Sequence, residues 1–262
     1  MKKVLLTSIC IMMLAVVFAS NSKSTAREYY LLRIYHCSAQ QQIDHIDDYL
    51  QNTYIPFMHK MGIKKVGVFT PIDNATTIDK KIYVWLPLKN IQQVEAINKN
   101  MEQFDPMGNQ KMIHLENADS SLPYNRIETV LSIAFKGLPQ YEKTSSLTKS
   151  NPDERIFEFR NYESPTENAH LRKVHMFNEG DEIGLFKRLN FNAIFYAKVI
   201  AGGNMPNLIY MTSFNNMADR DAHWKAFVED AYWKKISTDP KYLNAVNKHE
   251  VILMKAKPYA DF

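Results

Sequence analysis

The spacing of apolar residues along the chain changes between the two patterns typical of strands and helices. Short runs rich in aromatic and aliphatic residues, such as 29–36, are typical of strands. Longer segments with apolar residues three or four positions apart, such as 90–102, are typical of amphipathic helices. These patterns predict strands at 29–36, 66–69, 81–88, 127–135, 155–162, 192–200, 208–214 and 250–257, and helices at 40–61, 90–102, 167–189 and 217–236.

The predicted elements follow a β-α-β-β-α-β order, and this order occurs twice. The first strands of the two halves are also alike, since Leu32-Arg33-Ile34-Tyr35 stands where Phe159-Arg160-Asn161-Tyr162 stands. The order is that of the ferredoxin-like motif, whose helices cover one face of an antiparallel sheet. Because the other face is apolar and has to be covered, we expect the halves to pack sheet to sheet as an internal pseudo-dimer. The fold class predicted is α+β, with tandem ferredoxin-like units.

The polar, turn-rich segment 137–153 divides the chain into the two repeats. It predicts a linker between an N-terminal unit, 28–136, and a C-terminal unit, 154–262. Tethering favours pairing of the units within one chain. Any homo-oligomer is then expected to use helix faces or edge strands.

The first 19 residues have the pattern of a secretory signal peptide. A basic start precedes an apolar run from Val4 to Phe18, and Val17 and Ala19 suit cleavage after Ala19. The run is too short for an ordinary membrane span, although an uncleaved anchor is the alternative. We therefore expect a periplasmic or secreted protein with a linker at 20–27 and no membrane span after cleavage.

Composition narrows the classes of partner and of chemistry. The chain is 45% hydrophobic and 23% charged, as in ordinary globular proteins, and its net charge of +4 is scattered. The absence of a basic block argues against nucleic-acid binding. After signal cleavage Cys37 is the only cysteine, so no internal disulfide can form. A packed free thiol is favoured there over a nucleophile.

The last predicted helix, 217–236, carries an apolar stripe expected to face the core. Asn215 and Asn216 precede the helix and can cap it. Trp224 and Trp233 are nine positions apart, which places them on opposite sides of an ideal helix. The stripe is composed of Met217, Trp224, Phe227, Val228 and Ala231.

Four stretches of the second half resemble the NIPSNAP family, in a bacterial, secreted branch. They are 157–164, 169–180, 205–214 and 217–235. The resemblance implies a dimeric α+β barrel fold, in which the paired sheets form the barrel. It implies no settled reaction, although relatives with this barrel include small-molecule monooxygenases and heme-degrading enzymes. The secretory signal argues against the organelle-linked roles of the mitochondrial members.

Candidate ligand-binding residues lie on the two matching strands. Alternation puts Arg160 and Tyr162 on the face opposite Phe157 and Phe159. Arg33 and Tyr35 occupy the matching positions in the first strand of the first half. Pointing into the barrel, these side chains could bind a carboxylate or carbonyl; pointing outward, they would be ordinary strand surface.

Two histidines on the predicted helix 167–189 offer a further candidate. His170 and His175 are separated by about 140° around the helix, so they cannot easily share a metal, and we expect solvated polar residues. His175 is the axial candidate if the barrel holds heme. His223 follows Asp219 by four positions, which suits an ion pair more than a general base.

The sequence leaves several functional hypotheses open. The first is a barrel that binds a small ligand or partner without chemistry of its own. The alternatives are a small-molecule enzyme of cofactor-independent monooxygenase or isomerase type, and a heme-binding protein. No catalytic residue, metal site or cofactor is predicted.

Overall fold

The computed structural model of the chain describes residues 26–102, 122–141 and 150–262, and it confirms the β-α-β-β-α-β order in both halves. The strands are β1 (Tyr29–Cys37), β2 (Gly67–Pro71), β3 (Lys80–Leu88), β4 (Arg126–Ala134), β5 (Ile156–Glu163), β6 (Asn192–Ala201), β7 (Asn207–Phe214) and β8 (Lys248–Ala256). The helices are α1 (Gln40–Tyr49), π-helical η1 (Leu50–Tyr54), α2 (Ile55–Lys60), α3 (Gln92–Glu102), α4 (Glu167–Asn178), α5 (Glu182–Arg188), α6 (Met217–Glu229) and α7 (Ala231–Ser237). The predicted signal peptide, 1–19, lies outside the described residues, as do most of the linker 20–27 and part of 137–153.

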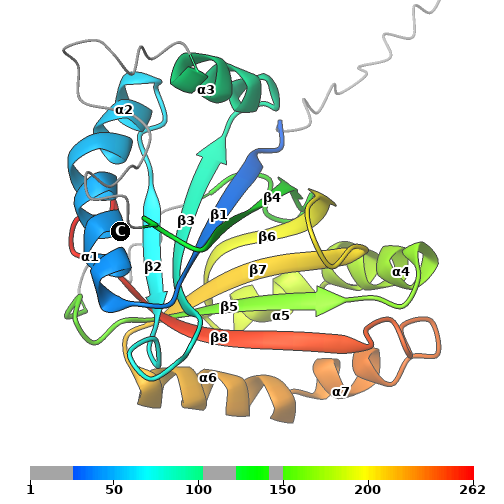
Figure 1. The fold of residues 1–262 in the computed structure, drawn as a ribbon. Helices are drawn as coiled ribbons and strands as arrows, with labels where there is room; N and C mark the ends of the chain where they lie inside the picture. The colour runs from blue at the N-terminus through cyan, green and yellow to red at the C-terminus, as the bar shows by residue number, and fades with distance from the viewer. Residues whose placement is uncertain (1–25, 103–121, 142–149) are drawn as a thin grey trace, which may run out of the picture.

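The eight described strands close into one antiparallel barrel in the order β1-β3-β2-β8-β5-β7-β6-β4 (Figure 1). The first half contributes the order β4-β1-β3-β2 and the second half the matching order β8-β5-β7-β6. The halves meet at the β2–β8 and β4–β6 pairs. The barrel closes within the chain as expected. The inner faces of the two half-sheets pack on each other across the core, as the Phe69–Phe157 and Tyr83–Phe159 ring contacts show, and the edges of the halves also pair. Edge pairing satisfies the backbone groups that a stacked arrangement would leave open.

The barrel interior is filled by large apolar side chains. Trp85 of β3 stacks on Phe195 of β6 with ring centroids 5.5 Å apart, and Phe262 at the chain end packs against Trp85 at 5.8 Å. Phe157 and Phe159 of β5 point into this same core. Strand alternation therefore turns the next residues, Glu158 and Arg160, outward toward the helices.

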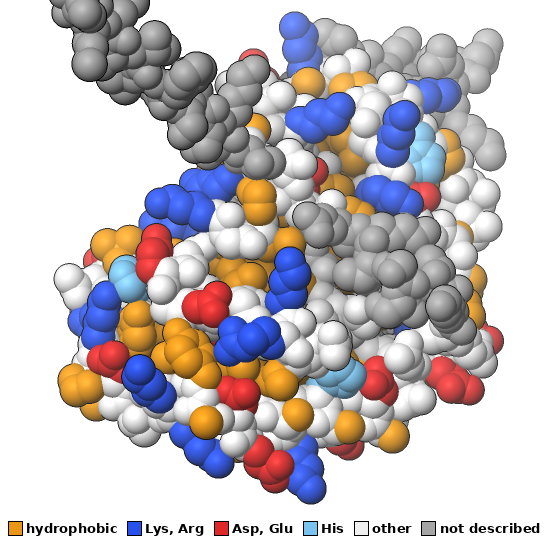
Figure 2. Space-filling model, turned by 180° about the vertical axis from the view of Figure 1, so that it is seen from behind, with side chains coloured by type: hydrophobic (Ala, Val, Ile, Leu, Met, Phe, Trp, Pro, Cys, Tyr) orange, Lys and Arg blue, Asp and Glu red, His pale blue; other side chains and the backbone are white. Residues whose placement is uncertain are grey.

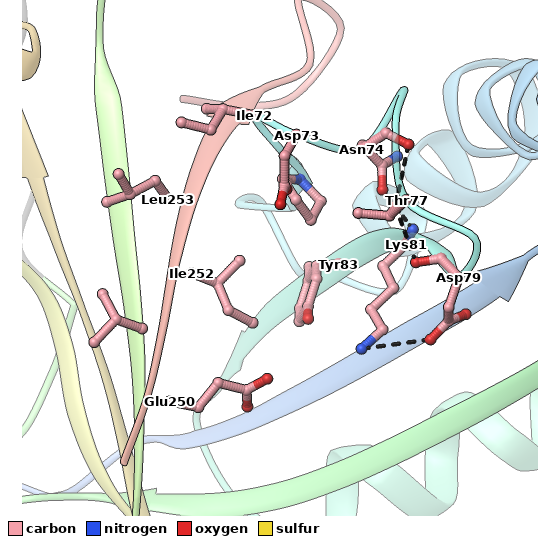
Figure 3. Close-up of a pocket in the computed structure, with 12 residues that line it drawn as sticks. Ile72, Asp73, Asn74, Thr77, Asp79, Lys81, Tyr83, Glu250, Ile252 and Leu253 are labelled. Carbon is pink, nitrogen blue, oxygen red and sulfur yellow. Dashed lines mark hydrogen bonds and ion pairs between the residues drawn. The ribbon is translucent and has the colours of Figure 1, made fainter.

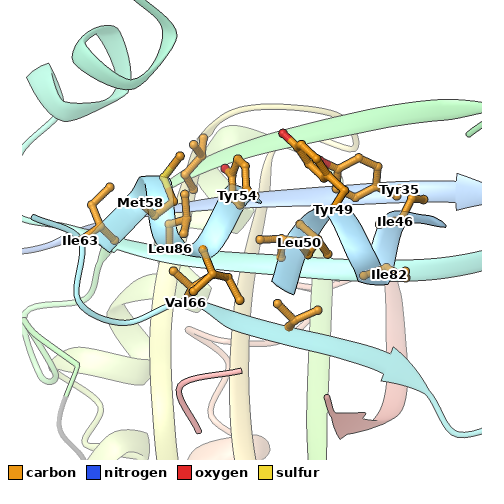
Figure 4. Close-up of a cluster of buried hydrophobic side chains, with 14 of the residues drawn as sticks. Tyr35, Ile46, Tyr49, Leu50, Tyr54, Met58, Ile63, Val66, Ile82 and Leu86 are labelled. Carbon is orange, nitrogen blue, oxygen red and sulfur yellow. The ribbon is translucent and has the colours of Figure 1, made fainter. Parts of the chain in front are cut away.

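Helices cover the outside of the barrel on opposite sides (Figure 1). Helices α1 to α3 lie over the first half, where Ile43 and Ile46 are buried against β1 and β3 (Figure 4). Helices α4 to α7 lie over the second half, where Phe177 and Phe186 pack on Tyr196. Cys37 is buried as a free thiol, which confirms the packing expectation.

The predicted helix 40–61 is broken into three parts. It runs as α1, then as the π-helical turn η1, then as α2, with Pro56 in the first turn of α2. Proline has no N–H and cannot donate to the preceding turn, so the wide π turn stands where the regular hydrogen bond is missing. None of the helices in the described residues is long and apolar enough to cross a membrane.

The prediction of one helix over 217–236 is wrong. Asp230 interrupts it with an extended ψ of 133°, and its side chain caps α7 by accepting from the backbone N–H groups of Tyr232 and Trp233. The predicted stripe is wrong as well, since only its Phe227 is buried and Met217 and Val228 are exposed. The remaining members are half-buried Trp224 and exposed Ala231. The expected cap at Asn216 is confirmed by its bond from the Asp219 N–H at 2.9 Å.

Candidate functional site

One cavity lies at a mouth of the barrel, between the β2–β3 turn and β8 (Figure 3). It measures about 410 Å³, and Tyr83 and Glu250 lie among its lining residues. Its polar groups hold the turn together: Lys80 Nζ donates to three turn carbonyls, and the Lys81 N–H donates to Asn74 at 2.7 Å. Asp79 is paired with His36 and Lys81. These polar side chains are engaged in local structure, which makes this cavity a weak candidate.

A second cavity, which we call the second-half pocket, lies between the β5–β7 face of the barrel and helices α4 to α7. Its volume is about 310 Å³. Viewed from behind, hydrophobic side chains broken by single charged ones gather over this part of the molecule (Figure 2). The lining residues are Arg160, Tyr162, Lys173, Glu182, Phe186, Tyr210, Arg220, Trp224, Phe227, Val228 and Trp233.

Glu158 is the centre of the charges beside this pocket, and its side chain is 0% exposed. One carboxylate oxygen accepts from Arg160 Nε at 2.5 Å; the other accepts from Arg220 Nε at 2.7 Å and from Trp224 Nε1 at 2.9 Å. The Arg160 guanidinium also lies 3.8 Å from the centre of the Trp224 ring. A buried carboxylate with three donors is fully satisfied and fixes the orientation of Arg160.

Arg160 reaches from this carboxylate to a pair of tyrosines. Its Nη1 donates to the Tyr162 hydroxyl at 3.0 Å, and the Tyr162 and Tyr210 hydroxyls are 2.9 Å apart. Burial raises the pKa of Tyr210 well above its usual value, so its hydroxyl stays protonated. The two tyrosines have two hydroxyl hydrogens, and one of these makes the hydrogen bond between the two hydroxyls. The other hydrogen can therefore be donated to an acceptor in the pocket.

An ion pair is buried at another side of the pocket. Lys173 Nζ of α4 lies 2.9 Å from Glu182 of α5, and their side chains are 7% and 3% exposed. Burial raises the pKa of Glu182, and the Lys173 ammonium acts against that rise. Gly180 allows the two helices to meet here, because a Cβ at this position would lie 2.6 Å from the Met176 carbonyl oxygen. The tight turn thus brings together two residues nine positions apart in the sequence.

The expected alternation of β5 is confirmed, but neither environment foreseen for Arg160 and Tyr162 is correct. They point away from the barrel interior, and they are not ordinary surface, because α4 to α7 enclose them in the second-half pocket. The structure also brings Trp224 and Trp233 to this pocket, contrary to their expected separation. The break at Asp230 turns α7 back, and the Trp233 ring lies 4.5 Å from that of Phe227.

Arg33 and Tyr35 occupy the corresponding face of β1. Their side chains lie under the first-half helices, with the Arg33 guanidinium 5.6 Å from the Tyr35 ring centre. The structure does not bring them to Arg160 and Tyr162, because the two helix layers are on opposite sides of the barrel (Figure 1).

His175 also lies apart from the second-half pocket. Its Nδ1 is 3.0 Å from the Tyr242 hydroxyl and its Nε2 is 2.9 Å from Lys241 Nζ, so both nitrogens have partners. His170 is not the solvated residue expected, since it is only 2% exposed. Burial and, to a lesser extent, Lys198 lower the pKa of His170 to about 4, so the ring is neutral at pH 7. The His223 Nδ1–H donates to the Asp219 carbonyl oxygen, 2.7 Å away.

Several residues of the pocket were not identified from the sequence. Glu158 could have been identified from strand alternation, which places its side chain on the same face of β5 as Arg160 and Tyr162. The sequence gives no comparable signal for Lys173, Glu182 and Arg220. These residues come together only through turns between helices, and residue spacing alone does not specify those turns. Within the described ranges, no three His, Cys, Asp or Glu side chains are grouped so that they could hold a metal ion.

Comparison with known structures supports the fold. A provisionally named monooxygenase of Lactobacillus acidophilus NCFM is similar over 88% of this chain and 94% of its own, with 9% identity and a TM-score of 0.54. Another of Fusobacterium nucleatum is similar over 88% and 93%, with 10% identity and a TM-score of 0.52. At such identities the likeness concerns the fold alone. No curated protein sequence matches the chain.

The family comparison concerns the half of the chain that forms the second-half pocket. The NIPSNAP family profile matches residues 157–261, which run from β5 through α4 to α7 and β8 to the last residues. All lining residues of the pocket fall within this range. The second half of this chain is therefore similar to the NIPSNAP family, and it forms one half of a single-chain α+β barrel.

Proposed function

We propose that this protein binds a small organic molecule in the second-half pocket. The observation that carries the proposal is the buried polar set formed by Arg160, Tyr162, Tyr210, Lys173 and Glu182 around a cavity of about 310 Å³. Burial of ionised groups is costly, and the first half builds the same fold with Leu31 and Ile46 where the second half has Glu158 and Lys173. The polar set is therefore better explained by a ligand than by the fold.

The cavity supports a specific class of ligand. Its volume has room for roughly ten water-sized groups. The rings of Trp224, Phe227 and Trp233 offer flat apolar walls, and the free hydroxyl hydrogen of the tyrosine pair offers one donor. A ligand with an apolar or aromatic body and one acceptor oxygen fits this combination.

The charges set a limit on the charge of this ligand. The lining contains Arg160, Arg220 and Lys173 against Glu182, with Glu158 directly behind Arg160. Arg220 also pairs with Asp221 at 2.9 Å. The three cations therefore face three carboxylates, so a neutral ligand is favoured over a charged one. His175 lies outside the pocket with both nitrogens engaged, so we do not propose heme ligation. No reaction is proposed, because the likeness to provisionally named monooxygenases is one of fold.

Tryptophan fluorescence offers a direct test, since Trp224 and Trp233 line the pocket and Trp85 is the only other tryptophan. Small molecules that copurify are first identified by mass spectrometry, and benzoate, phenol and coumarin serve as probes alongside them. We expect Tyr162→Phe to weaken binding roughly tenfold, as loss of one hydrogen bond would. The matched Tyr35→Phe change in the first half should leave binding unchanged.

A filling variant provides an independent test. Val228 lines the pocket but is 58% exposed, so Val228→Trp should cover the opening without disturbing the core. We expect this variant to fold as the parent does and to lose ligand binding. Equal binding by the parent, Tyr162→Phe and Val228→Trp would show that the ligand is held elsewhere and that the proposal is wrong.

Export and assembly complete the proposal. The signal-like first 19 residues support export of a bacterial, secreted NIPSNAP protein, and intact mass of the exported protein should place its N-terminus at Ser20. A protein that still begins at Met1 would contradict this. The closed barrel leaves no free edge among the described strands, so we propose that any homo-oligomer forms through helix faces. Light scattering on the mature chain tests the oligomeric state.

A further inference from the structure

Arg33 occupies the strand position of Arg160 but has very different surroundings. It lies on β1 between Val84 of β3 and Thr129 of β4, and it faces the first-half helices. No described carboxylate lies within ion-pair distance of its guanidinium, and its Nε is buried without a hydrogen-bond partner. Arg33 as a whole is half-buried, and a cation partly removed from water without a counter-charge destabilises the folded state.

The groups nearest Arg33 are aromatic. The guanidinium carbon lies 5.6 Å from the centre of the Tyr35 ring and 5.7 Å from that of Tyr54. Burial works against the charge on Arg33, but the neighbouring tyrosine oxygens outweigh it and raise the pKa, so the side chain stays charged. The rings stabilise the cation in part, but they supply no negative charge.

Tyr54 adds a second unsatisfied group to this region. Its side chain is 0% exposed, and its hydroxyl makes no hydrogen bond of regular geometry to a described residue, with the Arg33 guanidinium beside it. Tyr54 is the last residue of η1, and π-helical turns occur frequently at functional sites. Figure 4 shows Tyr54 within the cluster between helix and sheet, and its ring lies 5.9 Å from that of Tyr49. Burial is the main cause that raises the pKa of Tyr54, so the hydroxyl remains a donor.

These groups line a cavity of about 300 Å³, which we call the first-half pocket. Its apolar walls come from β1 and α3, and exposed Asn98 and Thr129 mark its opening to solvent. The lining residues are Leu31, Arg33, Tyr54, Val94, Ile97, Asn98, Met101 and Thr129.

We infer that the first-half pocket is a second binding site, which takes a monocarboxylate with an apolar tail. The carboxylate would pair with Arg33 and accept from the Tyr54 hydroxyl, and the tail would lie against Leu31, Val94 and Ile97. One cation matches one negative charge, whereas a phosphate dianion would need more positive groups than the described pocket offers. The inference does not depend on the second-half pocket, which belongs to the other half of the barrel.

Calorimetric titration of the full chain with octanoate tests this inference. Octanoate has about ten non-hydrogen atoms, which suits the volume, and octanamide has the same tail without the charge. We expect octanoate to bind, octanamide to bind roughly tenfold or more weakly, and inorganic phosphate not to compete. Failure of octanoate and of shorter and longer alkyl carboxylates to bind would overturn the inference. Equal binding of acid and amide would also overturn it.

Variants locate the binding and separate it from folding. Arg33→Met should reduce octanoate binding roughly tenfold or more, Asn98→Trp should block the opening, and Arg126→Met, which removes an exposed charge from β4, should change neither. Because Arg33 is half-buried and has no counter-charge among the described residues, Arg33→Met should keep or raise the urea midpoint. A strongly lowered midpoint would show that Arg33 is a structural residue, and unchanged octanoate binding would place the ligand elsewhere.

Discussion

The two halves of the barrel place an arginine at the same position of their first strands, but they surround it with different chemistry. Arg160 lies beside buried Glu158, whereas the equivalent neighbour of Arg33 is the apolar Leu31. On the covering helices, the fourth residue is His170 in α4 and Ile43 in α1. Each of these four residues is buried.

The seventh helix residue continues the contrast, with Lys173 in α4 and Ile46 in α1. The two halves nevertheless have the same strand order and the same helix layer. The architecture therefore tolerates apolar residues at these positions, and the charges of the second half serve something other than the fold. This comparison supports the proposed role of the second-half pocket in ligand binding.

The largest effect is expected from Glu158→Ala. The change leaves Arg160 and Arg220 without their shared buried carboxylate, which should lower the free energy of unfolding by about 3–5 kcal/mol. Glu163→Gln on the same strand breaks an ion pair with the largely exposed Lys248 and should cost no more than about 1 kcal/mol. Urea unfolding measures both. Similar midpoints would mean that the Glu158 network is not the centre of the second half.

The Lys173–Glu182 pair tests whether the second half can be converted to the apolar pattern of the first. Lys173→Met alone leaves Glu182 buried and unpaired. It should lower the free energy of unfolding by an amount near the lower end of about 3–5 kcal/mol, because Glu182 can take up a proton. The double variant Lys173→Met/Glu182→Leu should be neutral or more stable by about 1–4 kcal/mol. A double variant less stable than Lys173→Met would show that the fold needs the pair.

Trp224→Phe isolates one hydrogen bond of the Glu158 network. The ring over Arg160 is retained, but the bond from Nε1 to Glu158 is lost, which should cost about 1.5–3 kcal/mol. Trp233→Phe is the matched control, because its indole nitrogen makes no hydrogen bond to a described residue and its ring contact with Phe227 is kept. Equal losses for the two variants would indicate that ring size rather than the hydrogen bond decides stability.

The smallest effect near neutral pH is expected from His170. His170 has a pKa lowered from 6.5 to about 4 in the folded state, so the unfolded chain binds the proton more tightly. Its contribution to stability is present above pH 6.5 and is lost as the pH falls toward 4: about 1 kcal/mol is lost by roughly pH 5.5 and about 3 kcal/mol by pH 4. His170→Leu, which resembles Ile43 of the first half, should lose less stability than the parent across this range. Parallel pH profiles of the two proteins would contradict the lowered pKa.

Local sequence pattern was sufficient for much of the fold. The alternation of β5 separated Phe157 and Phe159 from Arg160 and Tyr162, because successive strand residues point to opposite faces. It could not identify what lies on each face. The outward face is neither solvent nor barrel interior, and only the packing of α4 to α7 makes it a pocket.

The helix 217–236 shows why spacing failed where the chain bends. A continuous helix would separate Trp224 and Trp233, but Asp230 ends α6 and caps α7, so both rings reach one cavity. Asp230 was visible in the sequence, yet an aspartate within a helical pattern is compatible with either continuation or a cap.

The sequence by itself determined the repeated β-α-β-β-α-β order and the matching arginine positions, because hydrophobic periodicity and strand alternation are local properties of the chain. Only the tertiary structure decided that the halves join edge to edge, and that Glu158, Lys173 and Glu182 surround Arg160 while Arg33 has no described carboxylate. These outcomes depend on helix ends, turns and strand partners that are distant in sequence. Together they decide whether a charged side chain packed between helix and sheet lies beside an opposite charge of the protein.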